Sequence, residues 1–123
     1  MILVDTSVWV DHLRRGDDGL SALLDQAQVL THPFVIGELA LGDLRERQQM
    51  LSLLEHLPAA ENATHLEVMQ LIGAEQLFGR GIGYVDAHLL AAVRLSPGAR
   101  LWTRDARLQR VAEAMGLAEP ARA

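Results

Sequence analysis

The sequence predicts an α/β fold in which helices flank a central, mostly parallel sheet. Short apolar runs of strand length alternate along the chain with longer segments of helical periodicity. The chain has 123 residues, 50% of them hydrophobic and 22% charged, so we expect a single domain over residues 1–123 with a sizeable core. Cysteine is absent and aromatic residues make up 4%, which predicts an aliphatic core without disulfides.

The first half of the chain begins with a continuous apolar run at residues 2–4, which is typical of a buried parallel strand. A helix capped by Thr6 or Ser7 is expected to follow it and to end near Leu13. The later elements are a turn at 16–19, a helix over 20–27, a strand at 29–31, a helix from Pro33 to Gly42 and a helix over 44–54.

The second half begins with a capping box, because Thr64 precedes an apolar run and Glu67 follows three residues later. The apolar stripe of this helix continues to Phe78. The remaining elements are a glycine loop at 79–83, a helix at 84–95, a strand at 100–103, a helix at 105–115, a last edge strand at 117–118 and a tail over 120–123.

Charge and composition exclude several classes of function. The net charge is −5 at pH 7, which argues against non-specific adhesion to nucleic acid or membranes. All 11 basic residues are arginines, and the missing lysine excludes Schiff-base enzymes, Walker-A nucleotide binding and phospho-aspartate receivers. The chain has no basic leader, and no apolar stretch approaches the roughly 20 residues of a membrane span, so we expect a cytoplasmic protein.

Two aspartates follow predicted strands. Asp5 comes directly after the first strand, and Asp105 comes soon after the strand predicted at 100–103. Because parallel strands end at one edge of a sheet, and ligands bind beyond that edge, both aspartates are candidate site residues. The alternative for each is a helix cap.

Two further carboxylates lie on predicted helices. Glu38 shares a helix face with Phe34 and Leu41, so we expect a desolvated carboxylate that binds a metal or pairs with an arginine. Asp86 lies in the first turn of its helix on the same face as Leu89. A surface charge that stabilises the helix dipole is the alternative for Asp86.

These four acids together indicate a site for a hard divalent cation. Converging carboxylates repel one another, and a bound cation relieves that repulsion. Ligands that are all oxygen atoms favour Mg²⁺ or Mn²⁺ over zinc. The chemistry that this predicts is phosphodiester cleavage, in which the metal activates a water molecule.

Three arginines recur at three-residue spacing from the end of the strand predicted at 100–103 into the helix that follows, namely Arg104, Arg107 and Arg110. Positive charge at a helix N-terminus opposes the helix dipole, so binding of a phosphate of the substrate would explain them. The alternative is an ordinary solvated face. Trp9 and Trp102 are candidates for stacking on a base, although core packing is the more frequent role of tryptophans that flank buried elements.

Taken together, the sequence resembles the PIN-domain family, in particular the VapC-type toxins of bacterial toxin–antitoxin pairs. The order of the matching segments is more specific than any one of them. These segments are residues 1–9, residues 33–41 around Glu38, residues 81–91 around Asp86, and residues 101–105.

The resemblance implies a ribonuclease that cleaves structured RNA, such as tRNA or rRNA, with Mg²⁺ or Mn²⁺. It also implies a VapB-type antitoxin partner, a homodimer within a larger complex, and no direct contact with DNA or a membrane. A PIN fold kept as a non-catalytic binding module is the alternative, which the presence of all four acids disfavours. The implied site comprises the acids Asp5, Glu38, Asp86 and Asp105, with supporting hydroxyls on Ser7 and Thr103.

Overall fold

Three short strands form a parallel sheet at the centre of the molecule. The computed structural model describes residues 1–120, and its sheet contains β1 (Ile2–Val4), β2 (Val29–Leu30) and β3 (Arg100–Trp102) in the order β2-β1-β3. Both pairings with β1 are parallel, and Leu3 is in register with Leu30 and with Leu101. The predicted α/β fold with a parallel sheet is therefore confirmed.

Helices connect and cover these strands. Within residues 1–120, none of them has the length and hydropathy to cross a lipid bilayer. Of the predicted tail, residues 121–123 lie outside the described part of the chain. The helices are α1 (Thr6–Arg15), α2 (Asp18–Asp25), α3 (Pro33–Ala40), α4 (Arg47–Glu55), α5 (His65–Ala74), α6 (Tyr84–Leu95) and α7 (Ala106–Ala114).

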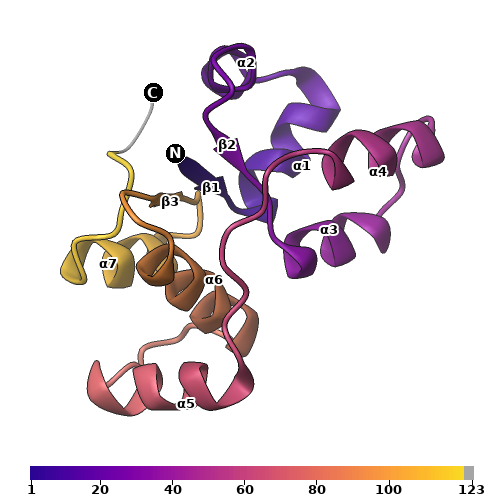
Figure 1. The fold of residues 1–123 in the computed structure, drawn as a ribbon. Coiled ribbons are helices and arrows are strands. Elements are labelled where there is room, and N and C mark those ends of the chain that lie inside the picture. The colour runs from indigo at the N-terminus through magenta and orange to yellow at the C-terminus, as the bar shows by residue number, and fades with distance from the viewer. Residues whose placement is uncertain (121–123) are drawn as a thin grey trace.

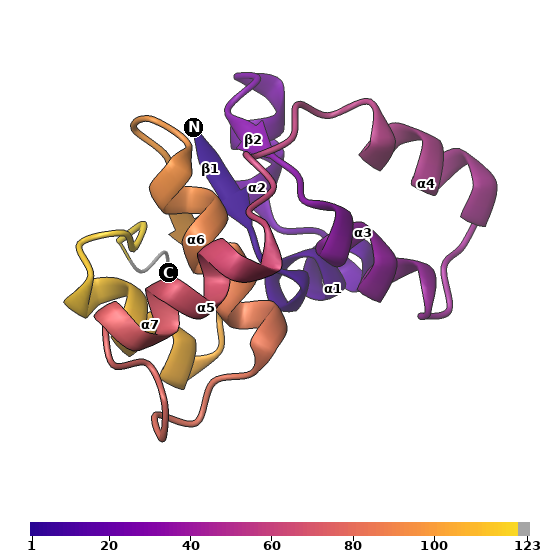
Figure 2. The same cartoon turned by 60° about the horizontal axis from the view of Figure 1, so that its bottom comes forward.

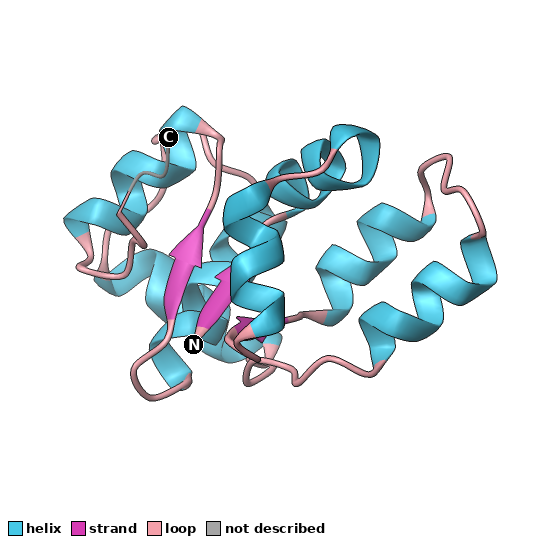
Figure 3. Ribbon diagram, turned by 90° about the horizontal axis from the view of Figure 1, so that it is seen from above, coloured by secondary structure: helices cyan, strands magenta, loops and turns pink. Residues whose placement is uncertain are grey.

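The helices divide between the two faces of the sheet. Helices α1 and α2 lie on one side of it and α6 and α7 on the other, as Figure 1 shows. Helix α5 packs along α6 (Figure 2). Helices α3 and α4 pack together and project away from the sheet, on the side opposite α7 (Figure 3).

The core is built mainly from the aliphatic strand residues and from α6. Leu3 and Leu101 on the sheet and Leu89 on α6 are completely buried. Trp9 and Trp102 belong to the same core, each with 3% of its surface exposed. Core packing, rather than base stacking, is therefore the role of both tryptophans in this structure.

Several predicted boundaries are wrong for identifiable reasons. Neither Thr6 nor Ser7 caps α1: the residue that precedes the helix is Asp5, and no side chain donates or accepts a capping hydrogen bond there. The predicted turn at 16–19 instead opens α2, because Asp17 accepts a hydrogen bond from the backbone N–H of Leu20 at 3.0 Å.

Two further elements are shorter than predicted. The helix expected over 44–54 begins only at Arg47. The edge strand expected at 117–118 is a single parallel bridge between Leu101 and Ala118.

Only part of the predicted apolar stripe faces the core: Ile72 packs against it and Leu77 is 3% exposed. Leu66 is 66% exposed and Met69 is 48% exposed, whereas Val68 is completely buried. Helix α5 also ends at Ala74 and does not continue to Phe78.

Candidate active site

The four predicted acids lie near one another at the carboxyl edge of the sheet. Asp5 follows β1 directly, and Asp105 follows β3. Asp86 lies in the first turn of α6 and Glu38 on α3. The pKa of Asp86 is raised by its own burial and then by repulsion from Asp5, Asp105 and Glu38. Each of the other three acids is thus close enough to disfavour the charge on Asp86.

Asp5 is the most constrained of the four acids. Only 7% of its surface is exposed. The hydroxyls of Ser7 and Thr103 both donate to its Oδ2, each at 2.7 Å. Ser7 and Thr103, predicted as supporting residues, therefore both contact a carboxylate of the candidate site, and neither caps a helix.

The loop that follows β3 fixes the two hydroxyls in turn. The backbone N–H of Arg104 donates to the Oγ of Ser7 at 3.0 Å, and the N–H of Asp105 donates to the Oγ1 of Thr103 at 3.1 Å. The backbone of this loop therefore links Asp5 to Asp105, although the two residues are far apart in the sequence.

Asp86 and Asp105 each use one oxygen as a helix cap. Asp105 accepts a hydrogen bond from the N–H of Leu108 through Oδ1 at 2.9 Å, and Asp86 accepts one from the N–H of Gly83 through Oδ2 at 3.0 Å. The capping role considered for Asp105 is therefore present. Each capping hydrogen bond uses one carboxylate oxygen and leaves the second one for other contacts. Capping is therefore compatible with a role of Asp86 and Asp105 in the candidate site.

Glu38 differs from its predicted environment. We expected a desolvated carboxylate, but Glu38 is exposed and Leu41 on the same face is 90% exposed, because α3 projects from the sheet. None of the ion pairs among residues 1–120 includes Glu38, so the expected arginine partner is also absent. Instead, the Oγ1 of Thr6 donates to its Oε1 at 2.7 Å.

The donor atoms suit a hard, hydrated cation. Within residues 1–120, no three His, Asp or Glu side chains are close enough to hold a metal ion by themselves. Mg²⁺ usually binds through one or two carboxylates and keeps several waters, so direct contact with every acid is not required. Burial raises the pKa of Asp86, and repulsion from the other three acids raises it further; that repulsion is the kind that a divalent cation relieves.

Comparison with known proteins identifies the family of this chain. A family model described as the PIN domain matches residues 2–114. The chain belongs to the PIN-domain family. Two similar proteins are both named Ribonuclease VapC32 and come from Mycobacterium tuberculosis, strains CDC 1551 / Oshkosh and ATCC 25618 / H37Rv. Each is 51% identical over 118 residues, which cover 96% of this chain and 95% of the relative, and this confirms the predicted resemblance to VapC-type PIN ribonucleases.

The arginines of this PIN domain reach different parts of the chain. Arg104 forms ion pairs with Asp11, at 2.7 Å, and with Asp17, and its guanidinium carbon lies 5.6 Å from the ring centroid of Trp102. Arg107 lies instead against the loop that contains Gly81. Arg110 is exposed on α7.

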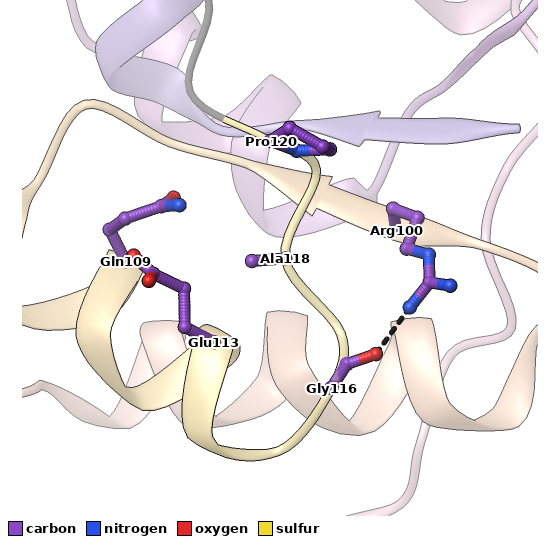
Figure 4. A pocket seen from close by; sticks show the side chains of 6 residues that line it. All are labelled: Arg100, Gln109, Glu113, Gly116, Ala118 and Pro120. Atoms are coloured by element: carbon purple, nitrogen blue, oxygen red, sulfur yellow. Dashed lines mark hydrogen bonds between the residues drawn. The ribbon is translucent and has the colours of Figure 1, made fainter.

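The PIN domain also has a hollow that contains none of the predicted site residues. It has a volume of about 450 Å³ and lies between β3, the end of α7 and the C-terminal segment (Figure 4). Arg100 crosses its rim and donates to the backbone oxygen of Gly116. The candidate site is instead the open group of carboxylates at the sheet edge.

Three side chains form contacts that the sequence did not predict. Thr6 was considered only as a cap, but it holds Glu38. His32 caps α3, since its Nδ1 accepts from the N–H of Phe34 at 3.0 Å. Tyr84 joins α5 to α6, because its hydroxyl lies 2.6 Å from Nδ1 of His65 and 2.9 Å from Nε2 of His88. The sequence contains a signal for the capping role of His32, because this histidine directly precedes a proline at the predicted start of a helix.

Proposed function

We propose that this protein is the toxin of a type II toxin–antitoxin pair and an endoribonuclease that hydrolyses phosphodiester bonds of structured RNA, such as tRNA or rRNA, in the cytoplasm. The single observation that carries the proposal is the grouping of four acids at the carboxyl edge of the parallel sheet, where Asp5, Asp105 and Glu38 lie close enough to Asp86 to add to the effect of burial in raising its pKa. A structural role would not require four carboxylates at one edge of a sheet, because they repel one another. The name of the relatives, Ribonuclease VapC32, supports the same activity.

In this proposal Asp5, Glu38, Asp86 and Asp105 hold a divalent cation, Mg²⁺ or Mn²⁺. Such a cation, when bound, activates a water molecule and neutralises charge on the phosphate that is attacked. The protein contributes orientation: Ser7 and Thr103 fix Asp5, and the capping hydrogen bonds fix the rotamers of the two helix-terminal aspartates.

We further propose a VapB-type antitoxin as the inhibitor of this site. A groove of about 420 Å³ lies between α1, α3 and α4, and Glu38 is part of its lining. Leu13, Leu39 and Met50 supply apolar surface in the groove. An antitoxin segment bound there would cover one of the four acids, which supports inhibition by direct obstruction. We expect a homodimer within that complex.

Incubation of purified protein with total cellular RNA tests the proposed activity. Discrete fragments are expected in Mg²⁺ or Mn²⁺, and none in the presence of a chelator. Asp86→Asn keeps the size of the side chain and removes its charge, so we expect cleavage to fall by about a hundredfold or more. Well-folded protein that leaves every RNA intact in both metals would support a non-catalytic binding module instead.

A further inference from the structure

Arg107 is held in place by the glycine loop before α6. Gly81 has φ +79°, a conformation that side chains rarely adopt. A Cβ at this position would lie 2.7 Å from Cδ, 3.2 Å from Nε and 3.1 Å from Nη1 of Arg107. The arginine side chain therefore lies across the backbone of Gly81, in space that only a glycine leaves open.

This contact connects the two acidic helix starts. Arg107 lies two residues after Asp105, in the first turn of α7. Gly81 lies two residues before Gly83, whose N–H is bound by Asp86. The Arg107 side chain thus extends from the Asp105 turn to the loop that leads to Asp86.

Arg107 is not neutralised by these acids. Among residues 1–120, none of its nitrogens lies within 4.0 Å of a carboxylate oxygen in an ion pair, whereas Arg104 has two such partners. Its position in the first turn of a helix is electrostatically unfavourable, so the stability of α7 does not account for it. A cation without an acidic partner is available to an anionic ligand.

We propose that Arg107 binds a backbone phosphate of the RNA at the carboxylate site, and that Arg104 does not. This inference rests on the proposed ribonuclease function and identifies one residue that recognises the substrate. Four acids repel an approaching polyanion, and a guanidinium that extends from the Asp105 turn to the loop before Asp86 can supply two parallel N–H donors for the phosphate oxygens. The ion pairs of Arg104 with Asp11 and Asp17 instead connect the loop after β3 to α1 and α2.

Binding and cleavage by three variants test the proposal. Arg107→Ala removes the guanidinium group, and Arg107→Lys keeps a positive charge without the planar pair of N–H donors. Arg94→Ala is the control. Arg94 is an exposed arginine in the last turn of α6 whose partner is Glu75, away from the four acids. Total tRNA is the binding probe, measured with full-length protein carrying Asp86→Asn so that the probe stays intact. Cleavage of total cellular RNA is measured with Asp86 present.

We expect Arg107→Ala to weaken tRNA binding about tenfold. The slope of log K against the logarithm of the salt concentration should become shallower by about one. Arg107→Lys should recover part of the affinity, and Arg94→Ala should remain within about twofold. The thermal midpoint of unfolding should not change in Arg107→Ala, because the side chain is exposed. Cleavage should fall in parallel with binding.

The outcomes separate this inference from the proposed function. If the wild-type protein cleaves RNA and Arg107→Ala matches Arg94→Ala in affinity and salt dependence, the role of Arg107 is refuted and the ribonuclease proposal survives. If the wild-type protein neither binds nor cleaves RNA, both fail. A lower unfolding midpoint in Arg107→Ala with unchanged salt dependence would assign Arg107 a structural role and overturn the proposal.

Discussion

Hydroxyl groups, and not arginines, contact two of the four carboxylates of the candidate site. Ser7 and Thr103 donate to Asp5, and Thr6 donates to Glu38. A hydroxyl fixes the position of a carboxylate without cancelling its charge, whereas an arginine would do both. The arrangement therefore preserves the negative potential that a cation needs.

Thr103 gives a prediction at the level of one residue. Thr103→Val keeps the shape of the side chain but removes the hydroxyl that donates to Asp5 and accepts from the N–H of Asp105. We expect the free energy of unfolding to fall by about 1–3 kcal/mol, because a buried acid and a backbone N–H lose a partner. Cleavage of RNA should fall about tenfold through misplacement of Asp5.

Thr103→Ser is the matched control, since it retains the hydroxyl and should keep most of the activity. Urea unfolding and the cleavage assay measure both effects. Equal activity of Thr103→Val and the wild-type protein would show that this hydroxyl does not position Asp5.

At the scale of elements, local signals predict where helices begin better than they predict what the helices face. The capping box of Thr64 and Glu67 is present, with hydrogen bonds of 2.9 and 3.1 Å. The helix predicted at 84–95 has those bounds. Exposure of Glu38 and Leu66 was not predictable, because helical periodicity defines a face but not whether another element covers it.

The start of α3 depends on a buried neutral histidine. His32 is completely buried, and its Nδ1 accepts the N–H of Phe34. Burial, and then the nearby His88, lower its pKa from 6.5 to about 4. Protonation would turn the accepting nitrogen into a donor and remove the cap of the helix that carries Glu38.

A pH dependence of stability follows from this lowered pKa. The unfolded chain binds a proton at His32 below about pH 6.5, whereas the folded chain does so only near pH 4. The contribution of His32 to the free energy of unfolding is therefore complete above pH 6.5. It is lost as the pH falls toward 4, by about 3 kcal/mol in total.

Urea unfolding of His32→Asn at pH 7, 5.5 and 4.5 measures this contribution. Asparagine is a capping residue that does not titrate, so the loss of stability toward acid should be smaller than in the wild-type protein. His56→Asn, at an exposed position, should leave the wild-type dependence unchanged. An identical acid dependence in all three proteins would contradict the assignment to His32.

At the scale of the whole molecule, parallel topology brings together acids that are distant in the sequence. Two of them follow strands, and parallel strands end at one edge, so the proximity of Asp5 and Asp105 was predictable. The partners of Arg104 and Arg107 were not, because long side chains choose among several neighbours that only the tertiary structure supplies. The pattern of three-residue spacing gave no sign that one arginine pairs with Asp11 and Asp17 and the other lies against Gly81.

The central claim is that the four acids repel one another and that a divalent cation relieves the repulsion. Thermal unfolding with increasing MgCl₂ or MnCl₂, against NaCl of equal ionic strength, tests this claim without knowledge of the RNA target. A cation that binds the folded state raises the unfolding midpoint in proportion to the logarithm of its concentration.

Asp86→Asn supplies the comparison. Since the pKa of Asp86 is raised, its ionised form destabilises the fold, and the variant should be more stable than the wild-type protein at neutral pH without a divalent cation. The account predicts a saturable rise in the midpoint of the wild-type protein and a much smaller rise in Asp86→Asn. No rise beyond that in NaCl, or an equal rise in both proteins, would contradict a cation site at these carboxylates.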